Sequence, residues 1–561
     1  MPVEGWRRYL EFLDDSPYSM QLLTSNLAPE SPIADVQTVR VEALNYTLFP
    51  FQQKILDRVG VDALIVGLPT GLGKTYLAGA FIARESARNP CRVLFLTPSV
   101  PLGVQQTLFA RRMLNLKDAY FISGSIPPER RGALNVWNAG FAVTTPQTFY
   151  NDVLSRFSSK IEGAKREGDP IIYLAQVFRE KGFTFPYNLV IADECHGYIG
   201  ETDGYSILLA AKACGSQILA LSATPQLHAP GRLQELKKVF GQIEVFSVEE
   251  PEIKVHMPER VIALVSVFAP PKLLAVYYQL EKVIRVYRDK VKKAYGAQHL
   301  RGYCRNRSHW LCVCLLALRI MRTRIVEDGA SSVLKYGIWK LRELRQPVAE
   351  LGGKSVYDTY REVLKGGFNH KITATMNILS RKEFEKAIVF VESVEAAKQI
   401  GVMLQRQYGV EKVAVLVGKG GMNMEQQASA LLQFRDKAGI LVCTSIGEEG
   451  LDVPVADIEV WMDPPSNPKK WIQRFGRILR QSGGKKMAKT YALVSMKTHE
   501  RNKLLGTKRR VEKVYGFTQS LVEENLPRAP VKGQRTLSHY MGEGNEDVNY
   551  HPLKRVAFHR S

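Results

Sequence analysis

Short apolar runs alternate with helix-length segments over two separate stretches of the chain. Runs that are apolar on both faces and end in polar or small residues are typical of parallel strands covered by helices on both sides. In the first stretch, about 48–250, the runs lie at 63–68, 92–98, 142–147, 188–194 and 217–224. In the second stretch they lie at 387–393, 413–418, 438–445, 457–463 and 489–495. We therefore expect an α/β fold with two parallel-sheet lobes.

The segment between the lobes, about 260–380, reads as helix. Apolar residues recur at three- and four-residue spacing from Leu273 to Val291, with lysines and arginines on the other face. Residues 270–380 hold 21 Lys and Arg against 8 Asp and Glu, a net +13 out of +22 for the whole chain. A solvated helical face would tolerate such charge, but its concentration favours a nucleic-acid contact.

These patterns divide the chain into five parts. We expect an N-terminal extension at 1–45, a first lobe at 46–255, a basic helical insert at 256–383, a second lobe at 384–510 and a partly ordered tail at 511–561. The first twenty residues lack the apolar core of a signal peptide, and no uncharged run approaches the roughly 20 residues that span a bilayer. Together with seven scattered cysteines, these features predict an intracellular protein.

A glycine-rich turn follows the strand expected at 63–68 and opens a helix. Its sequence is Pro-Thr-Gly-Leu-Gly-Lys-Thr at 69–75. Backbone N–H groups at such a turn close on phosphate, and the helix dipole favours the anion. Lys74 would reach the β- and γ-phosphates of a nucleotide, and Thr75 would hold Mg²⁺. The general phosphate-loop pattern wants glycine where Leu68 stands.

Two adjacent carboxylates, Asp193 and Glu194, end the apolar run at 188–194. A surface turn would explain them in isolation, but a buried strand tip about 120 residues after a phosphate loop favours a catalytic pair. Asp193 would bind Mg²⁺ and Glu194 would polarise the attacking water. Farther along, Arg474, Arg477 and Arg480 recur every three residues, so one helix would present them as a row to a phosphoryl transition state. The alternative for this row is an exposed basic helix.

These elements, in this order, resemble superfamily 2 helicases. The turn at 69–75 looks like that superfamily's own phosphate loop, and Asp193–His196, Ser222–Thr224, Thr444–Pro454 and Gln473–Arg480 resemble its later motifs. Within the superfamily, TPSVPLGVQQ at 97–106, TTPQTFYNDVL at 144–154 and TSIGEEGLDVP at 444–454 are similar to the archaeal Hef and eukaryotic FANCM group. The resemblance covers about 45–500 and implies two RecA-like lobes with a mainly helical insert between them.

The resemblance also implies a role for each matching residue. Nucleotide and Mg²⁺ contacts fall on Gly71, Gly73, Lys74, Thr75, Asp193 and Asp452, with Gln52 on the adenine. Glu194 would serve hydrolysis, and Gln473, Arg477 and Arg480 would complete the ATP site from the second lobe. Hydrolysis would be coupled to movement through His196, Ser222 and Thr224. The nucleic-acid backbone would be touched by Thr97, Pro98, Thr145, Pro146, Gln147, Thr444 and Ser445.

The resemblance predicts an ATP-dependent DNA helicase or translocase for forked or branched DNA in fork repair. Cys195 stands where Hef-like proteins usually have alanine, and the sequence DECH also occurs in RNA-directed relatives. An RNA-directed or duplex-RNA translocase is therefore one alternative, and an ATP-regulated clamp that unwinds nothing is another. The ERK-x-x-x-D nuclease signature is absent from the sequence, so we expect no strand cleavage.

Two weaker patterns stay open. A cluster of histidines and cysteines could ligate zinc, although its spacing matches no standard site and buried core cysteines explain it better. The cluster comprises His299, Cys304, His309, Cys312 and Cys314. Near the C-terminal end, Gln534, Leu537, Tyr540 and Met541 have the spacing of a sliding-clamp-binding peptide.

Overall fold

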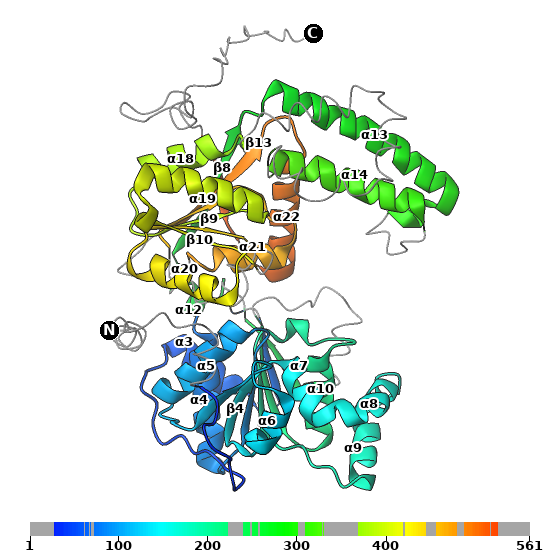
Figure 1. The fold of residues 1–561 in the computed structure, drawn as a ribbon, viewed down its shortest axis with the longest axis vertical. Coiled ribbons are helices and arrows are strands. Elements are labelled where there is room, and N and C mark those ends of the chain that lie inside the picture. The colour runs from blue at the N-terminus through cyan, green and yellow to red at the C-terminus, as the bar shows by residue number, and fades with distance from the viewer. Residues whose placement is uncertain are drawn as a thin grey trace.

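The computed structural model describes most of the two expected lobes and the core of the insert. It covers residues 27–60, 62–66, 68, 72–222, 239–246, 249–255, 258–300, 309–327, 329, 369–418, 421–444, 456–478, 487–516 and 518–524. Within these residues the strands form two separate seven-stranded sheets, and every strand pair is parallel. Figure 1 shows the two sheets in two lobes, one above the other, with a pair of long helices projecting from the second lobe.

The first lobe has the strand order β3-β4-β2-β5-β6-β1-β7. Its strands are β1 (Ala63–Val66), β2 (Val93–Leu96), β3 (Ala119–Ile122), β4 (Phe141–Thr144), β5 (Leu189–Ala192), β6 (Gln217–Ser222) and β7 (Gln242–Val245). All five strands expected in this stretch are present, whereas β3 and β7 are additional. Both additions are short strands at the edges of the sheet, where the apolar signal is weakest.

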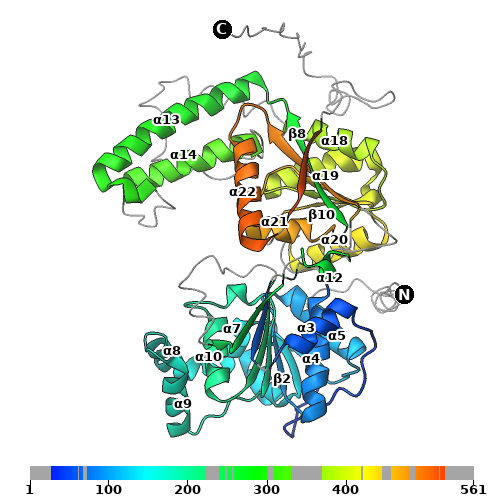
Figure 2. The ribbon, with the colours of Figure 1, turned by 180° about the vertical axis from the view of Figure 1, so that it is seen from behind.

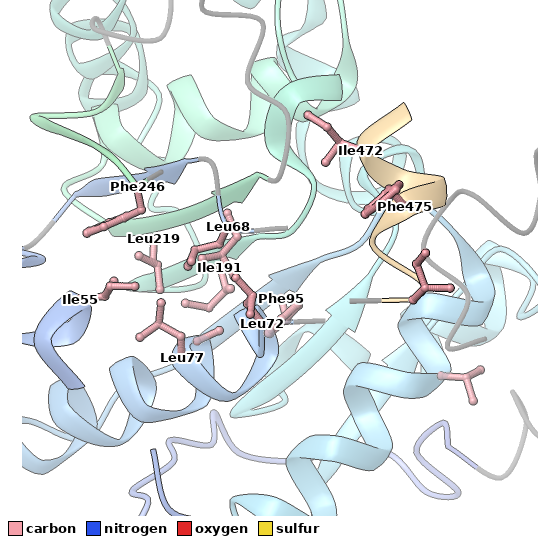
Figure 3. Close-up of a cluster of buried hydrophobic side chains, with 14 of the residues drawn as sticks. Ile55, Leu68, Leu72, Leu77, Phe95, Ile191, Leu219, Phe246, Ile472 and Phe475 are labelled. Atoms are coloured by element: carbon pink, nitrogen blue, oxygen red, sulfur yellow. The ribbon is translucent and has the colours of Figure 1, made fainter. Parts of the chain in front are cut away.

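Helices cover both faces of the first sheet, because successive side chains of a strand point to opposite faces. Phe95 packs with α3 (Pro50–Arg58), α4 (Lys74–Arg88) and α5 (Val100–Met113), whereas its neighbour Leu94 packs on the other face with α9 (Pro170–Glu180) and α10 (Asp203–Ala213). The described part of this lobe also contains α6 (Pro128–Ala133), α7 (Pro146–Phe149) and α8 (Ser158–Ala164). Figure 3 shows Leu72 and Leu77, at the start of α4, in the same cluster as Phe95 and Ile191.

The second lobe has the strand order β10-β11-β9-β12-β13-β8-β14. Its strands are β8 (Glu259–Val267), β9 (Ala387–Phe390), β10 (Val413–Leu416), β11 (Ile440–Cys443), β12 (Ile458–Trp461), β13 (Met487–Ser495) and β14 (Ser520–Glu524). The accompanying helices are α18 (Ile372–Arg381), α19 (Val394–Tyr408), α20 (Met424–Asp436), α21 (Pro468–Phe475) and α22 (Glu500–Tyr515). A short helix, α12 (Pro251–Lys254), lies between the lobes (Figure 2).

The structure corrects both boundaries of the second lobe. Strand β8, which we expected inside a helical insert beginning at 256, pairs with β13 over nine residues and belongs to the second sheet. Its run is apolar on both faces, and periodicity alone does not distinguish such a strand from a segment of buried helix. Strand β14, expected in the tail beginning at 511, pairs with β8 at the sheet edge. Helix α18 also packs in this lobe's core rather than in the insert.

The described part of the insert is a pair of packed helices, α13 (Pro271–Tyr295) and α14 (Trp310–Glu327). They lie side by side in both ribbon views (Figures 1 and 2). The apolar stripe expected on α13 is confirmed, because Leu273, Tyr277, Leu280, Ile284, Tyr287 and Val291 are all buried. Cys312 and Cys314 lie in the same apolar core, which supports the core interpretation for these two; Cys304 lies outside the described residues.

Candidate functional site

The phosphate-loop turn leads directly into helix α4. Gly73 adopts a left-handed backbone with φ of 76°, and the helix begins at Lys74. Gln52 of α3 donates from Nε2 to the Leu72 carbonyl at 2.9 Å and accepts from the Phe49 N–H at 2.9 Å. Gln52 is therefore anchored against the turn at the place where an adenine contact is expected. Gly71 lies outside the described residues.

The carboxylate pair follows β5 and meets the lysine of the turn. The Glu194 carboxylate accepts from Lys74 Nζ at 2.8 Å, and both side chains are largely buried. Glu194 has a left-handed backbone, with φ of 49°, and its N–H donates to Asp193 Oδ1 at 2.9 Å. This bend follows the strand tip, where the sequence places the two consecutive carboxylates.

The two carboxylates differ in their electrostatic surroundings. Burial and the adjacent Glu194 carboxylate raise the pKa of Asp193 to about 6. Burial also opposes ionisation of Glu194, but the Lys74 ammonium and His196 outweigh it and hold the pKa of Glu194 below its ordinary value. Glu194 is therefore the member of the pair that ionises first, and Lys74 holds its carboxylate. Asp193 has a neighbouring negative charge that a bound cation would relieve.

Gln106 joins the two residues expected to hold a cation. Its Nε2 donates to Thr75 Oγ1 at 3.3 Å and to Asp193 Oδ2 at 3.4 Å. A hydroxyl and a carboxylate held around one amide are hard oxygen ligands of the kind that Mg²⁺ takes beside nucleotide phosphates. The residue types therefore fit Mg²⁺. The sequence analysis missed Gln106, although it ends the TPSVPLGVQQ segment whose likeness to the Hef and FANCM group had been noted.

His196 connects the carboxylate pair to the neighbouring strand. Its Nδ1 lies 3.2 Å from Ser222 Oγ and 3.3 Å from Glu194 Oε2. Ser222 ends β6, which lies between β5 and β1 in the sheet. Residues from three adjacent strands therefore meet at one sheet edge. Thr224, the third residue expected to couple hydrolysis to movement, lies outside the described residues.

The residues expected to touch nucleic acid lie beyond the ends of β2, β4 and β11. The Thr97 N–H donates to the Thr144 carbonyl at 2.9 Å, which brings the Thr97–Pro98 and Thr145–Gln147 segments to the same edge. Pro98 and Gln147 are exposed, and Thr145 and Pro146 are partly exposed. Thr97 and Thr444 are buried, so their hydroxyls face the protein in this structure. Ser445 lies outside the described residues.

The arginines of the second lobe do not form a row on one helix. Helix α21 ends at Phe475, so Arg474 lies in the helix and Arg477 lies beyond it. Arg474 is 1% exposed; it donates to the Asp463 carbonyl at 2.8 Å and to Glu392 Oε2 at 3.2 Å. Arg474 therefore stabilises its own lobe. This corrects the expectation that one helix presents Arg474 and Arg477 as a row. Arg480 and Asp452 lie outside the described residues.

Gln473 and Arg477 remain candidates for a nucleotide contact from the second lobe. Both are largely buried, and the Arg477 N–H donates to the Arg474 carbonyl at 2.9 Å. In both ribbon views α21 lies on the side of the second lobe that faces the first lobe (Figures 1 and 2). The apolar residues Ile472 and Phe475 are buried in the large cluster drawn in part in Figure 3.

No set of three or more His, Cys, Asp or Glu side chains in the described part of the chain is grouped closely enough to hold a metal ion. None of the described helices combines the length and the apolarity that a membrane crossing requires.

Comparison with protein families gives two matches. Residues 42–227 match the family described as type III restriction enzyme, res subunit, and residues 370–482 match the helicase conserved C-terminal domain. Among solved structures, the Pyrococcus furiosus Hef helicase domain has a TM-score of 0.50 at 22% identity, covering 83% of this chain and 98% of that chain. That likeness supports the fold, with two lobes of parallel sheet covered by helices.

Three curated relatives illustrate the sequence matches. A putative ATP-dependent RNA helicase of Methanocaldococcus jannaschii is 25% identical over 80% of this chain and 58% of its own length. The ATP-dependent DNA helicase mph1 of Neurospora crassa is 25% identical over 85% of this chain and 44% of its own length. The DEAD-box ATP-dependent DNA helicase Fancm of Drosophila melanogaster is 23% identical over 78% of this chain and 33% of its own length. The chain thus matches about half the length of such relatives, or less.

Two RecA-like lobes, with the two family matches and the contact between Lys74 and Glu194, are those of a superfamily 2 helicase. Within that class the chain is similar to the Pyrococcus furiosus Hef helicase domain in fold and to part of the mph1 and Fancm helicases in sequence.

Proposed function

We propose that this chain is an ATP-dependent DNA helicase or translocase that acts on forked or branched DNA in replication-fork repair. The observation that carries the proposal is the meeting of Lys74, Asp193 and Glu194 at one edge of the first sheet. A binding protein needs the lysine, but hydrolysis also needs a carboxylate placed to activate water. The intact Glu194 therefore argues against a clamp that only binds ATP.

The same edge supports a division of labour among its side chains. Thr75 and Asp193 would hold Mg²⁺, which would neutralise charge on the β- and γ-phosphates. Lys74, which now pairs with Glu194 at 2.8 Å, would turn to the γ-phosphate and release the Glu194 carboxylate. Glu194 would then accept a proton from the attacking water. Gln52 would bind the adenine, anchored by its contact with the Leu72 carbonyl.

The second lobe would supply positive charge to the other side of the nucleotide. We assign this role to Arg477 and Arg480, with Gln473 and Asp452 nearby in the sequence. Fixed guanidinium groups stabilise the charge that develops on a transferred phosphoryl group. His196 and Ser222 would couple changes at Glu194 to movement of β6. The nucleic-acid backbone would run past Pro98, Thr145, Pro146 and Gln147.

We propose DNA as the substrate because several of the relatives are named as DNA helicases. One relative is named as a putative RNA helicase, so an RNA-directed translocase is the second candidate. Unwinding and ATP hydrolysis on DNA and RNA forks of identical sequence, with and without ATP, separate the candidates. Stimulation and unwinding by DNA forks alone support the proposal. Stimulation by RNA alone, or ATP-dependent binding without turnover, contradicts it.

The outer face of the insert supports a grip on branched nucleic acid. On α13 the exposed cations include Lys272, Lys282, Arg285, Arg288, Lys290, Lys292 and Lys293. Such a face would neutralise phosphates on a duplex arm and release their counterions. Lys282→Glu with Arg285→Glu should lower the preference for forked over linear DNA, whereas the same change at the exposed Lys412 and Lys437 should leave it intact. An unchanged preference in the first variant excludes this role.

A second partner is proposed from sequence alone. The peptide with Gln534, Leu537, Tyr540 and Met541 lies outside the described residues, and its spacing is that of a sliding-clamp ligand. Leu537→Ala with Tyr540→Ala should abolish binding to an immobilised clamp while ATP hydrolysis persists. Binding that survives both changes removes the clamp from the proposal.

A further inference from the structure

The insert returns to the second lobe through a buried lysine. Lys371 precedes α18, is fully buried, and donates from Nζ to Glu500 Oε1 at 2.5 Å and to the Met462 carbonyl at 2.6 Å. The next carbonyl along the chain, that of Asp463, accepts from Arg474 Nη1 at 2.8 Å. Lys371 and Arg474 therefore hold consecutive carbonyls at the exit of β12. One cation comes from the root of the insert and the other from the helix that leads to Arg477.

The departure of the insert is tied to the same place. Glu327, at the end of α14, is 3% exposed and forms an ion pair with Lys503 of α22. The Glu327 carbonyl accepts from Asn369 Nδ2 at 2.9 Å, and Asn369 Oδ1 accepts from the Lys371 N–H at 2.9 Å. The two ends of the insert are thus joined to each other as well as to the second lobe.

The contacts continue to the other side of α21. Asp463 Oδ2 accepts from the Glu392 N–H at 2.6 Å, and the Glu392 carboxylate pairs with Lys470 and Arg474 of α21. Glu392 also interacts electrostatically with Arg324 of α14. An unbroken set of polar contacts therefore runs from α14, through the exit of β12, to α21.

Buried charges make this connection stiff. Lys371 and Glu500 are both fully buried, so separating them would leave an uncompensated charge away from water. A shift of the insert that preserves these pairs must carry the β12–α21 turn with it. Packed interiors respond to such shifts by moving whole elements rather than by stretching contacts.

We propose that Lys371 is a positioning residue that links the insert to the arginine-bearing segment after α21. When nucleic acid engages the insert, the linkage places Arg477 for hydrolysis, so nucleic acid raises turnover through this contact. Arg477 follows Arg474 by three residues and donates its N–H to the Arg474 carbonyl, so a displaced Arg474 displaces Arg477. This inference rests on the proposed function, because it requires ATP hydrolysis that nucleic acid stimulates.

Two variants of the full chain test the linkage. Lys371→Met combined with Glu500→Gln removes both buried charges together, and Glu327→Gln weakens the pair with Lys503 while preserving shape. Forked DNA is the probe, and kcat without DNA, kcat with saturating DNA and the Kd for DNA are measured. We expect the DNA-stimulated kcat to fall about five- to thirty-fold, with basal kcat and Kd within about two-fold of the unmodified chain.

The ratio of stimulated to basal kcat separates positioning from structure. Loss of folded protein lowers both rates in proportion and leaves that ratio unchanged, and an unchanged ratio in folded Lys371→Met with Glu500→Gln overturns the inference. Lys382→Met with Glu524→Gln is the control for loss of an ion pair in the same lobe, because that pair at 3.2 Å joins residues outside β12 and α21. If DNA does not stimulate the unmodified chain, the proposed function itself fails.

Discussion

The Lys74 ammonium lies 2.8 Å from the Glu194 carboxylate, so the two groups neutralise each other in this structure. ATP hydrolysis would need each of the two groups for a different task. The pair joins residues that are 120 positions apart in the sequence. Lys74 starts α4, which follows β1, and Glu194 follows β5, which is separated from β1 in the sheet by β6. A nucleotide phosphate would compete for the lysine and release the carboxylate for work on water, which makes ATP binding and activation of Glu194 parts of one event.

Removing the lysine should abolish turnover. Lys74→Ala takes away the positive charge that the γ-phosphate would meet, and we expect nucleic-acid-stimulated ATP hydrolysis to fall by at least about 10²-fold. Steady-state phosphate release checks this. Retained turnover in this variant contradicts the assignment of the phosphate loop.

Removing only the charge of Glu194 should separate binding from hydrolysis. In Glu194→Gln the residue can no longer take a proton from water, so kcat should fall by about 10²–10⁴-fold. ATP affinity should persist, since Lys74 loses a competing partner. Binding of a fluorescent ATP analogue and single-turnover hydrolysis measure the two effects. A parallel loss of both would assign Glu194 to binding instead.

Gly73→Ala should weaken the adenine contact. A Cβ at Gly73 would overlap Gln52 Nε2, and φ of +76° is costly for any residue with a side chain. We expect the free energy of unfolding to fall by about 1–2 kcal/mol and the preference for ATP over GTP to decline. Gly182→Ala is the control, because Gly182 has φ of +60° and a Cβ there meets nothing within 4 Å. It should share the strain but keep nucleotide selectivity.

Arg474 and Arg477 should respond differently to the conservative change to lysine. Arg474→Lys loses the fork that spans the Asp463 carbonyl and Glu392, so we expect mainly a loss of stability, about 1–3 kcal/mol by urea unfolding. Arg477→Lys should mainly lower kcat, by roughly 10²-fold or more. The reverse pattern would mean that Arg474, rather than Arg477, meets the nucleotide.

Acid should destabilise the second lobe before it affects the Glu392 cluster. Burial and the adjacent Lys371 lower the pKa of His370 from 6.5 to about 3. Between these values the unfolded chain binds a proton that the folded chain does not, so stability falls as pH drops through this window. The loss is at most about 1.4 kcal/mol per pH unit.

Other groups allow the acid effect to be assigned. Burial opposes the ionisation of Glu392, but Arg474 and Lys470 lower its pKa to about 2, so its contribution is lost only as the pH falls below about 4.5. Urea unfolding of the second lobe between pH 7 and 5 therefore separates the histidine effect from that of Glu392. His370→Gln should reduce the slope in that range without abolishing it, because His499 contributes in the same direction. An equal slope in this variant would point to His499, whose pKa is also lowered to about 3 by burial and by Arg322.

Most of the site could be predicted because its residues follow strands with strong local signals. The runs that end at Asp193 and Ser222 are apolar on both faces, and the turn before Lys74 has its own glycine pattern. The carboxyl ends of parallel strands meet at one edge of a sheet, which is why these motifs lie close together in the structure. Gln106 escaped notice because nothing in its helix indicates that it would reach Thr75 and Asp193.

The sequence by itself determined the two α/β lobes, the phosphate-loop turn, the carboxylate pair and the buried stripe of α13, because each depends on residues close together in the chain. Only the tertiary structure decided that β8 and β14 complete the second sheet, that Arg474 is buried in its own lobe, and that Lys371 shares the exit of β12 with it. The contact between Lys371 and the Met462 carbonyl joins residues 91 positions apart in the sequence, and that between Arg474 and the Asp463 carbonyl joins residues 11 positions apart. Periodicity cannot report them, because it shows which face of an element is buried but not what it is buried against.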